Sequence, residues 1–418
     1  MSDRPLARSL SRRSLLTGLA AAGGWALLPA GNSAAAPAAP HALAAVPPRP
    51  VTEVHLVGTD GWVSMPGSSP AIPPFWPDPL APANSNLYVF GFRDVTGMST
   101  AQITAQRGKA QISAPMLSFD QETDVKITLT NLGLAQRPDL VDGHTIHWHG
   151  FQNAIPLFDG VPELSIAVPI GRDFTYFYRP HDPGTYMYHC HFEDVEHVQM
   201  GMTGMLFVRP VQNKGTADVP PGKYVYNDGD GSTRYDREFA FMMTEIWAEA
   251  HYRDAHIQVS DWTDYSPTFF ALNGRSYPDT IAPNGDPMTG SGPLRYQPIS
   301  SLVTCNTGER VLLRLANLGY QNHAVSVDGI DLTVVGKDAG LLRGRDGSSE
   351  YTVTNTVEIA PGESRDVLFT APEPGTYLLY DRDYLSLTNG GGAGLGGQMT
   401  EIRVSPAGTL KPQTRPNA

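Results

Sequence analysis

Short β-type runs of apolar residues dominate the chain from about Pro47 onward. They include residues 54–57, 87–90 and 125–130, and clusters of Gly, Pro, Asn and Asp separate them. Turn signals recur at intervals of about ten residues, and no long helical periodicity appears. This pattern predicts an all-β fold built from Greek-key β-sandwiches.

Two histidine clusters lie in the first half of the chain. The first is HTIHWHG at 144–150, and the second is HCH at 189–191, followed by His197 and Met202. In an extended strand Cys190 would point to one face, while its two neighbours point to the other. A thiolate, imidazoles and a thioether form the ligand set of a blue-copper electron-transfer centre. We therefore expect such a centre on the inner side, from His144, Cys190, His197 and Met202. A patch of four imidazoles is expected on the flank, from His147, His149, His189 and His191.

An internal repeat predicts how the chain is divided. TNLG at 130–133 and HDPGTYMY at 181–188 recur as ANLG at 316–319 and PEPGTYLL at 372–379. The same strand plan thus occurs twice. The predicted parts are domain one at 46–211, a linker at 212–235, domain two at 236–405 and a loose tail at 406–418.

The repeat also shows what domain two lacks. Aligning Gly150 with Gly329 and Gly184 with Gly375 pairs the metal-binding side chains with mostly unsuitable ones. The pairs are His144 with His323, His147 with Ser326, His149 with Asp328, His189 with Tyr380, Cys190 with Asp381, and His191 with Arg382. Domain two is expected to keep the strand arrangement of domain one but to lack its metal ligands.

These motifs resemble those of a two-domain, laccase-like multicopper oxidase with type 1 copper in domain one. The resemblance implies two cupredoxin-like domains, with His144, Cys190 and His197 holding type 1 copper and Met202 as its weak axial ligand. It assigns His147 to a type 2 copper. The same resemblance gives His149, His189 and His191 to a type 3 pair.

Two features depart from that family. Residues 192–196 separate His191 from His197, so the loop that carries His197 is longer than usual. The family also builds its oxygen-reducing cluster from histidines of two facing domains, whereas domain two keeps only His323, at a type 1 position.

Three arrangements of the flank therefore stay open. Neighbouring subunits of a homotrimer could complete the site. A mononuclear or dinuclear copper could lie on the four flank histidines, or the flank could hold no catalytic metal. The replacement ligands considered for domain two are Asp328, Tyr380, Asp381 and Asp383.

Composition and charge narrow the class of protein to which the chain can belong. With 41% hydrophobic and 17% charged residues, the chain is an ordinary globular protein, and its net charge of −12 argues against nucleic-acid partners. No segment is apolar for long enough to span a membrane. Residues 1–45, with Arg12-Arg13, predict a twin-arginine signal, hence export to the periplasm or outside the cell. A bridge between Cys190 and Cys305 is the minor alternative to a metal-bound Cys190.

The expected function is that of an exported copper oxidoreductase. A small reductant, a phenol or a metal ion, would deliver single electrons through the exposed edge of His197, and Cys190 would pass them to His189 and His191 for dioxygen reduction. One alternative is a non-enzymatic blue-copper carrier or copper-binding protein. Another is an enzyme resembling copper nitrite reductase, although Arg382 would be a very poor ligand there. The segment around His251 and His256 could border a substrate entrance.

Overall fold

The computed structural model describes residues 49–66 and 76–418, of which Arg49–Ala418 belong to one compact unit. The predicted export signal lies outside the described residues. Among the helices that are described, none has the length and apolarity needed to cross a membrane.

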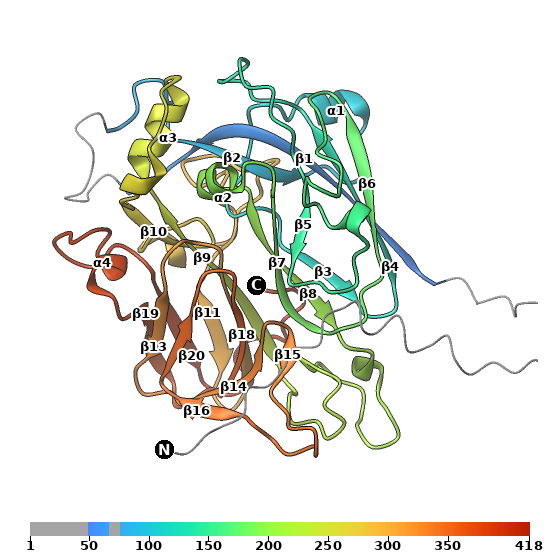
Figure 1. The fold of residues 1–418 in the computed structure, drawn as a ribbon. Coiled ribbons are helices and arrows are strands. Elements are labelled where there is room, and N and C mark those ends of the chain that lie inside the picture. The colour runs from blue at the N-terminus through green and yellow to red at the C-terminus, as the bar shows by residue number, and fades with distance from the viewer. Residues whose placement is uncertain (1–48, 67–75) are drawn as a thin grey trace, which may run out of the picture. The chain divides into compact units, whose positions relative to one another are not determined.

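Two four-stranded sheets form the first half (Figure 1). β4 shows why these residues form strands, because Val125, Ile127 and Leu129 are buried while the residues between them are half-buried. One sheet has the order β2-β1-β4-β6, with β1 Val51–Val63, β2 Leu87–Asp94, β4 Asp124–Asn131 and β6 Asp173–Tyr178. The other has the order β3-β8-β7-β5, with β3 Leu117–Asp120, β8 Thr203–Arg209, β7 Gly184–His189 and β5 His147–His149.

The second half repeats this plan with larger sheets. The seven-stranded sheet has β10 Phe269–Leu272, β9 Arg237–Ile246, β12 Arg310–Asn317, β18 Ser364–Thr370, β14 Leu332–Lys337 and β15 Gly340–Leu341 in order, with β16 Thr352–Thr354 on β14. The five-stranded sheet has β11 Val303–Asn306, β20 Met399–Ser405, β19 Gly375–Asp381, β13 His323–Val327 and β17 Thr356–Ile359 in order. No ladder among the described strands joins the two halves, although the domain boundaries themselves stay a prediction.

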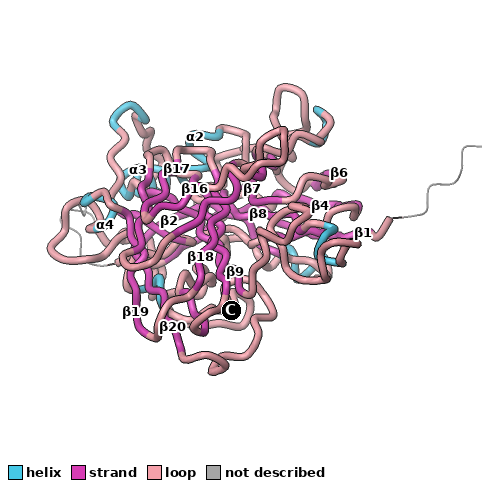
Figure 2. The backbone as a smooth tube through the Cα atoms, turned by 90° about the horizontal axis from the view of Figure 1, so that it is seen from below, coloured by secondary structure: helices cyan, strands magenta, loops and turns pink. Residues whose placement is uncertain are grey.

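Helices are short and lie between strands (Figure 2). The α-helices are α1 Thr100–Thr104, α2 Asp194–Met200, α3 Ala248–Ala255 and α4 Tyr384–Leu387. The 3-10 helices are η1 Pro156–Phe158, η2 Val211–Lys214, η3 Trp262–Asp264 and η4 Asp279–Ile281. The prediction of an all-β fold is therefore confirmed.

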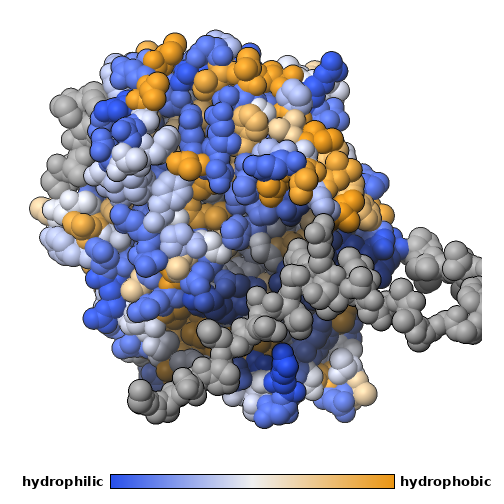
Figure 3. Space-filling model, in the orientation of Figure 1, coloured by the Kyte–Doolittle hydropathy of each residue, from blue (hydrophilic) through white to orange (hydrophobic). Residues whose placement is uncertain are grey.

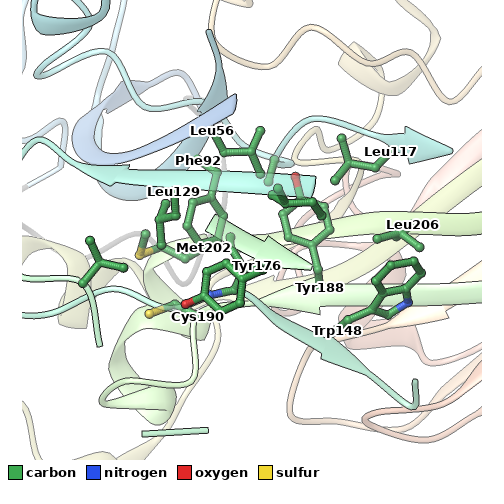
Figure 4. Close-up of a cluster of buried hydrophobic side chains, with 14 of the residues drawn as sticks. Leu56, Phe92, Leu117, Leu129, Trp148, Tyr176, Tyr188, Cys190, Met202 and Leu206 are labelled. Carbon is green, nitrogen blue, oxygen red and sulfur yellow. The ribbon is translucent and has the colours of Figure 1, made fainter. Parts of the chain in front are cut away.

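The core of the first half surrounds the predicted metal ligands. Leu56, Phe92 and Tyr188 belong to one cluster of buried side chains that also contains Cys190 and Met202 (Figure 4). Cys190 is fully buried, and so is Met202. The sulfur ligands thus lie inside the sandwich, on the face that strand alternation predicts for Cys190.

The predicted linker and tail are packed rather than loose. Val225 and Tyr226 of the linker are buried against Leu312 and its neighbours in the second half. In the tail, the Gln413 and Asn417 side chains accept hydrogen bonds from the backbone N–H groups of Glu238 and Ala240, both at 2.8 Å. These amides satisfy backbone groups of β9, so the expectation of a loose tail is wrong.

A buried ionic network connects the two halves at Arg314. Its Nη1 donates to Thr185 Oγ1 of β7 at 2.9 Å, and its guanidinium lies 4.5 Å from the centre of the Phe207 ring. Within the second half, Arg314 pairs with Glu238 at 3.2 Å and with Asp366 at 3.3 Å, and all three side chains are nearly inaccessible. Because these charged groups are buried, the fold is stable only if each of them keeps a partner of opposite charge.

Replacing Arg314 by Met should lower the free energy of unfolding by roughly 3–5 kcal/mol, because Asp366 would stay buried without its cation and Glu238 would keep only Arg209. Urea unfolding measures the change. The control is Arg403→Met, which removes an ion pair whose arginine side chain is 47% exposed and should cost less than about 1 kcal/mol. Equal losses in the two variants would contradict the network's role.

Candidate metal centre

Three predicted ligands converge on the sulfur of Cys190. Cys190 directly follows β7, His144 precedes β5, and His197 belongs to α2. Cys190 Sγ lies 3.2 Å from His197 Nδ1 and 4.0 Å from His144 Nδ1, and all three ligand atoms lie within 4.8 Å of one another. The Thr145 backbone N–H also donates to this sulfur at 3.4 Å. Both imidazoles therefore present the same ring nitrogen to one thiolate.

Met202 lies beside this group, and Gly58 makes room for it. A Cβ atom at position 58 would come within 2.6 Å of His144 Cδ2 and 3.3 Å of Met202 Cε. The backbone connects the same residues, because the Cys190 N–H donates to Met202 O at 3.2 Å and the Met202 N–H to His197 O at 2.9 Å. Figure 4 shows both sulfur-bearing side chains in the same region of the core.

His197 is carried by a helix and is not exposed. Asp194–Met200 form α2, which starts after Glu193 in the left-handed conformation (φ 47°). His197 is 0% exposed, and its Nε2 lies 3.8 Å from Asp142 Oδ2. The expectation of an exposed His197 edge is therefore wrong, because Asp142 and Glu193 lie next to the ring. Asp142 meets His197 only through the fold, whereas Glu193 is the residue that precedes α2, four positions before His197.

Electrostatics favours an ionised thiol at the centre. Burial alone would raise the pKa of Cys190, but the charge of His197 and hydrogen bonds from His144 and His197 lower it well below its usual value. Burial likewise opposes the charge on His197, yet Cys190 and Asp142 raise the pKa of His197 to about 10. The thiolate therefore has a cationic partner in the metal-free protein.

The donor set fits a copper ion. The buried Nε2 atoms of His144 and His197 have no hydrogen-bond partner, while their Nδ1 atoms face the sulfur. A thiolate with two imidazoles and a methionine nearby is the set that blue-copper sites use. Neither cysteine is bridged, so the alternative of a Cys190–Cys305 disulfide is wrong.

A second group forms on the flank, as strand alternation predicts. His147, His149 and His189 place one ring nitrogen each within 4.8 Å of the others, and His149 Nδ1 lies 3.3 Å from His189 Nε2. The His191 ring centre is 5.0 Å from that of His147 and 5.5 Å from that of His189. All four predicted flank histidines are thus neighbours, with three in the tighter group.

Backbone carbonyls orient two of these rings. His147 Nδ1 lies 2.6 Å from Asp159 O, and His189 Nδ1 lies 2.8 Å from Cys190 O. Each Nδ1 must carry a proton to donate to its carbonyl, so Nε2 is the unprotonated nitrogen of each neutral ring, as in metal-binding histidines.

Three of the flank histidines, His147, His149 and His189, are neutral at physiological pH. Burial lowers the pKa of His189 to about 3, and it also lowers the pKa values of His147 and His149. Neutral imidazoles are the form that binds a metal.

The second half holds a charged triad instead of a metal group. His323 Nδ1 lies 2.5 Å from Asp381 Oδ2 and His323 Nε2 lies 2.5 Å from Glu245 Oε1, with all three side chains 0% exposed. Burial opposes the charge on His323, but the hydrogen bonds that His323 donates to Asp381 and Glu245 raise its pKa to about 9. Asp381 is thus occupied, and the expectation that it could replace a copper ligand is wrong. Within residues 49–66 and 76–418, every candidate metal group lies in the first half.

The other replacement ligands have their own partners. Asp383 accepts the Leu385 N–H at the start of α4 at 2.7 Å, and Tyr380 OH donates to Asp328 at 3.1 Å. In the same chain, His149 Nε2 faces Gly362 of the second half. A Cβ atom added at Gly362 would lie 3.2 Å from this nitrogen. Replacement of the missing histidines by Asp328, Tyr380 or Asp383 stays a prediction.

Two multicopper oxidase family models match the chain, one over residues 95–213 and the other over 238–399, which together exceed half of its length. The chain belongs to the multicopper oxidase family. Laccase-1 of Emericella nidulans is 36% identical over 98 residues, which are 23% of this chain and 14% of that laccase. The match thus spans a small part of the relative's length.

Solved structures of a blue copper oxidase and of a copper nitrite reductase share the fold of the chain. The blue copper oxidase of Nitrosomonas europaea superposes with a TM-score of 0.60 at 22% identity, over 85% of this chain and 86% of the other. The copper nitrite reductase of the same organism superposes with a TM-score of 0.54 at 15% identity, over 85% and 95% of the two chains. These likenesses confirm the predicted cupredoxin-like fold.

A cavity of about 240 Å³ adjoins the helix that carries His197. Glu196 and Met200 of α2 and Ala250 and Asp254 of α3 line it. Burial is the main cause that raises the pKa of Asp254 to about 7, and burial also raises that of Glu196. The predicted substrate entrance near His251 and His256 thus falls beside a real cavity, although its use stays a prediction.

The triad should make stability depend on pH. Because folding raises the pKa of His323 from 6.5 to about 9, its contribution is complete below pH 6.5 and is lost as the pH rises through 9, a change of roughly 3 kcal/mol. Urea unfolding between these pH values measures it. The Asp381→Asn variant should show a smaller decline, and an equal decline in both proteins would contradict the assignment.

Proposed function

We propose that this chain is an exported copper-dependent oxidoreductase that takes single electrons from a small reductant, a phenol or a metal ion, and delivers them to dioxygen. The observation that carries the proposal is the convergence of His144 and His197 on Cys190, directly beside the imidazole patch. Export rests on the twin-arginine pattern in residues 1–45 and leads to the periplasm or the exterior.

His144, Cys190 and His197 would hold a type 1 copper, with Met202 as the axial ligand. The patch of His147, His149, His189 and His191 would hold further copper, as type 2 and type 3 ions. Bound copper supplies one-electron redox chemistry that no side chain here provides alone. The protein contributes the buried surroundings, the oriented rings and the neutral state of His147, His149 and His189.

The reductant would approach His197 from the side of Asp142 and Glu193. These carboxylates place negative charge next to the buried ring, which favours a cationic or hydrogen-bond-donating reductant. On the opposite side, Cys190 lies between His189 and His191 in the chain, so a short covalent path joins its sulfur to either imidazole. The chain itself therefore links the entry side to the patch.

A neighbouring subunit would complete the oxygen-reducing site in a homotrimer. Exposed apolar side chains occur between residues 141 and 170, close to His147 through Asp159. They are Val141, Ile155, Leu157, Leu164, Ile166 and Ile170. Apolar patches interrupt a mostly hydrophilic surface on the face seen in Figure 3. Clustered exposed apolar groups of this kind favour association.

The second candidate is a blue-copper electron carrier or copper-binding protein without oxidase activity. The second half favours this candidate. Both ring nitrogens of His323 are paired with carboxylates, so His323 is not available as a further ligand for the patch. A nitrite-reductase-like enzyme is less well supported, because Arg382 would take a ligand position and arginine stays protonated. Copper content and oxygen uptake distinguish these candidates.

The substitution Cys190→Ser should abolish the thiolate-to-copper absorption of the copper-loaded protein and stop oxygen uptake, because only the thiolate gives this band. Visible absorption and an oxygen electrode measure both effects. Cys305→Ser is the matched control, since Cys305 is also a free, buried cysteine but lies outside the candidate metal groups. A blue Cys190→Ser protein would refute the assignment.

The substitution His147→Gln should lower the copper content and oxygen uptake while the blue absorption remains, because His147 belongs to the patch and not to the Cys190 group. Metal analysis and electron paramagnetic resonance measure the loss. The control His181→Gln alters an exposed histidine and should change neither quantity. A wild-type protein with one copper per chain and no oxygen uptake would instead establish the carrier.

A further inference from the structure

The buried triad of Glu245, His323 and Asp381 occupies the counterpart of the copper centre. In the repeat alignment His323 corresponds to His144 and Asp381 to Cys190. Where the first half gathers a thiolate and imidazoles, the second half gathers an imidazolium between two carboxylates. Its third member, Glu245, lies on β9 and also contacts the first half.

Glu245 is connected to α2 by two routes. Its Oε2 accepts the Tyr320 backbone N–H at 2.6 Å, and the Tyr320 hydroxyl in turn donates to the Val195 carbonyl of α2. Its own backbone carbonyl accepts the side-chain amide of Gln199, also on α2, at 3.0 Å. Both routes end on a helix of seven residues, which is too short to be stable without tertiary contacts.

The two connected residues flank His197. Val195 and Gln199 are four positions apart and therefore share one side of the helix, whereas the residue midway between them projects to the other side. Gln199 reaches Glu245, and His197 reaches Cys190 Sγ at 3.2 Å. The helix thus lies between the triad on one side and the copper ligands on the other.

The chain is adapted to this close approach. A Cβ atom at Gly319 would come within 2.3 Å of both carboxylate oxygens of Glu245, so only glycine lets the carboxylate reach Tyr320 N and His323 together. The Tyr265 hydroxyl also donates to Glu245 Oε2, at 3.2 Å, a longer contact than the 2.6 Å one from Tyr320 N.

We propose that the Glu245–His323–Asp381 triad is a positioning device, which sets α2 and thereby His197 through Tyr320 and Gln199. The role rests on the proposed function, because it matters for chemistry only if His197 is a copper ligand. The second half of the chain then acts on the copper centre of the first half without supplying a ligand.

Tyr320→Phe tests the link, because it removes the hydroxyl bound to Val195 and keeps the ring and the N–H bound to Glu245. In the copper-loaded full chain, we expect a shifted thiolate-to-copper absorption and a changed copper hyperfine splitting in electron paramagnetic resonance. In the metal-free chain, backbone amides of residues 194–200 should exchange hydrogen about threefold to tenfold faster, the effect of losing one hydrogen bond.

Tyr265→Phe is the matched control. It also removes a hydroxyl from Glu245, and the Tyr265 ring packs 5.2 Å from that of Tyr320, but this hydroxyl is not bound to α2. It should leave both measurements as in the wild type. Glu245→Gln, which keeps the shape and removes the charge, should change both in the same direction as Tyr320→Phe and by more.

The proposal is wrong if Tyr320→Phe behaves like Tyr265→Phe in both measurements, or if Glu245→Gln behaves like the wild type. Failure of the proposed function looks different, because the wild-type protein itself would then lack the thiolate-to-copper absorption. The exchange comparison in the metal-free chain still decides whether the triad holds α2.

Discussion

The centre of the first half depends on keeping a charged sulfur inside an apolar sandwich. An isolated buried thiolate would be very unfavourable, and the structure answers with imidazole nitrogens at 3.2 Å and 4.0 Å and a backbone N–H at 3.4 Å. These partners come from two segments, His144 with Thr145 just before β5 and His197 on α2, so β7, α2 and the segment before β5 must all be in place. The ligands and the fold therefore require each other.

The second half solves the same packing problem with ions alone. The position equivalent to Cys190 holds Asp381 in the second half. There, Asp381, His323 and Glu245 fill the buried space with paired charges. Such a cluster is stable only when complete, because removing one member leaves a buried charge unpaired.

Much of this centre could be predicted from strand alternation and the repeat. Alternation places buried Cys190 in another group than its histidine neighbours, and among the described residues every candidate metal group lies in the first half. Two features could not be predicted. A seven-residue helix such as α2 is too short to show a periodic pattern, and it buries His197, which was expected to be exposed. Asp142 and Glu245 reach their histidines across many residues of sequence, so no local spacing indicates either contact.

The flank patch argues for a bound metal on energetic grounds. Rings brought together in this way lose water, and burial holds His189 neutral down to about pH 3, where its pKa lies. Backbone carbonyls also hold the Nδ1 side of two rings, which leaves Nε2 as their unprotonated nitrogen. One hydrogen bond joins His149 Nδ1 and His189 Nε2, whereas bound metal ions would give each unprotonated nitrogen a partner. The burial of these histidines is therefore explained if they bind metal, whereas burying them for packing alone would be energetically unfavourable.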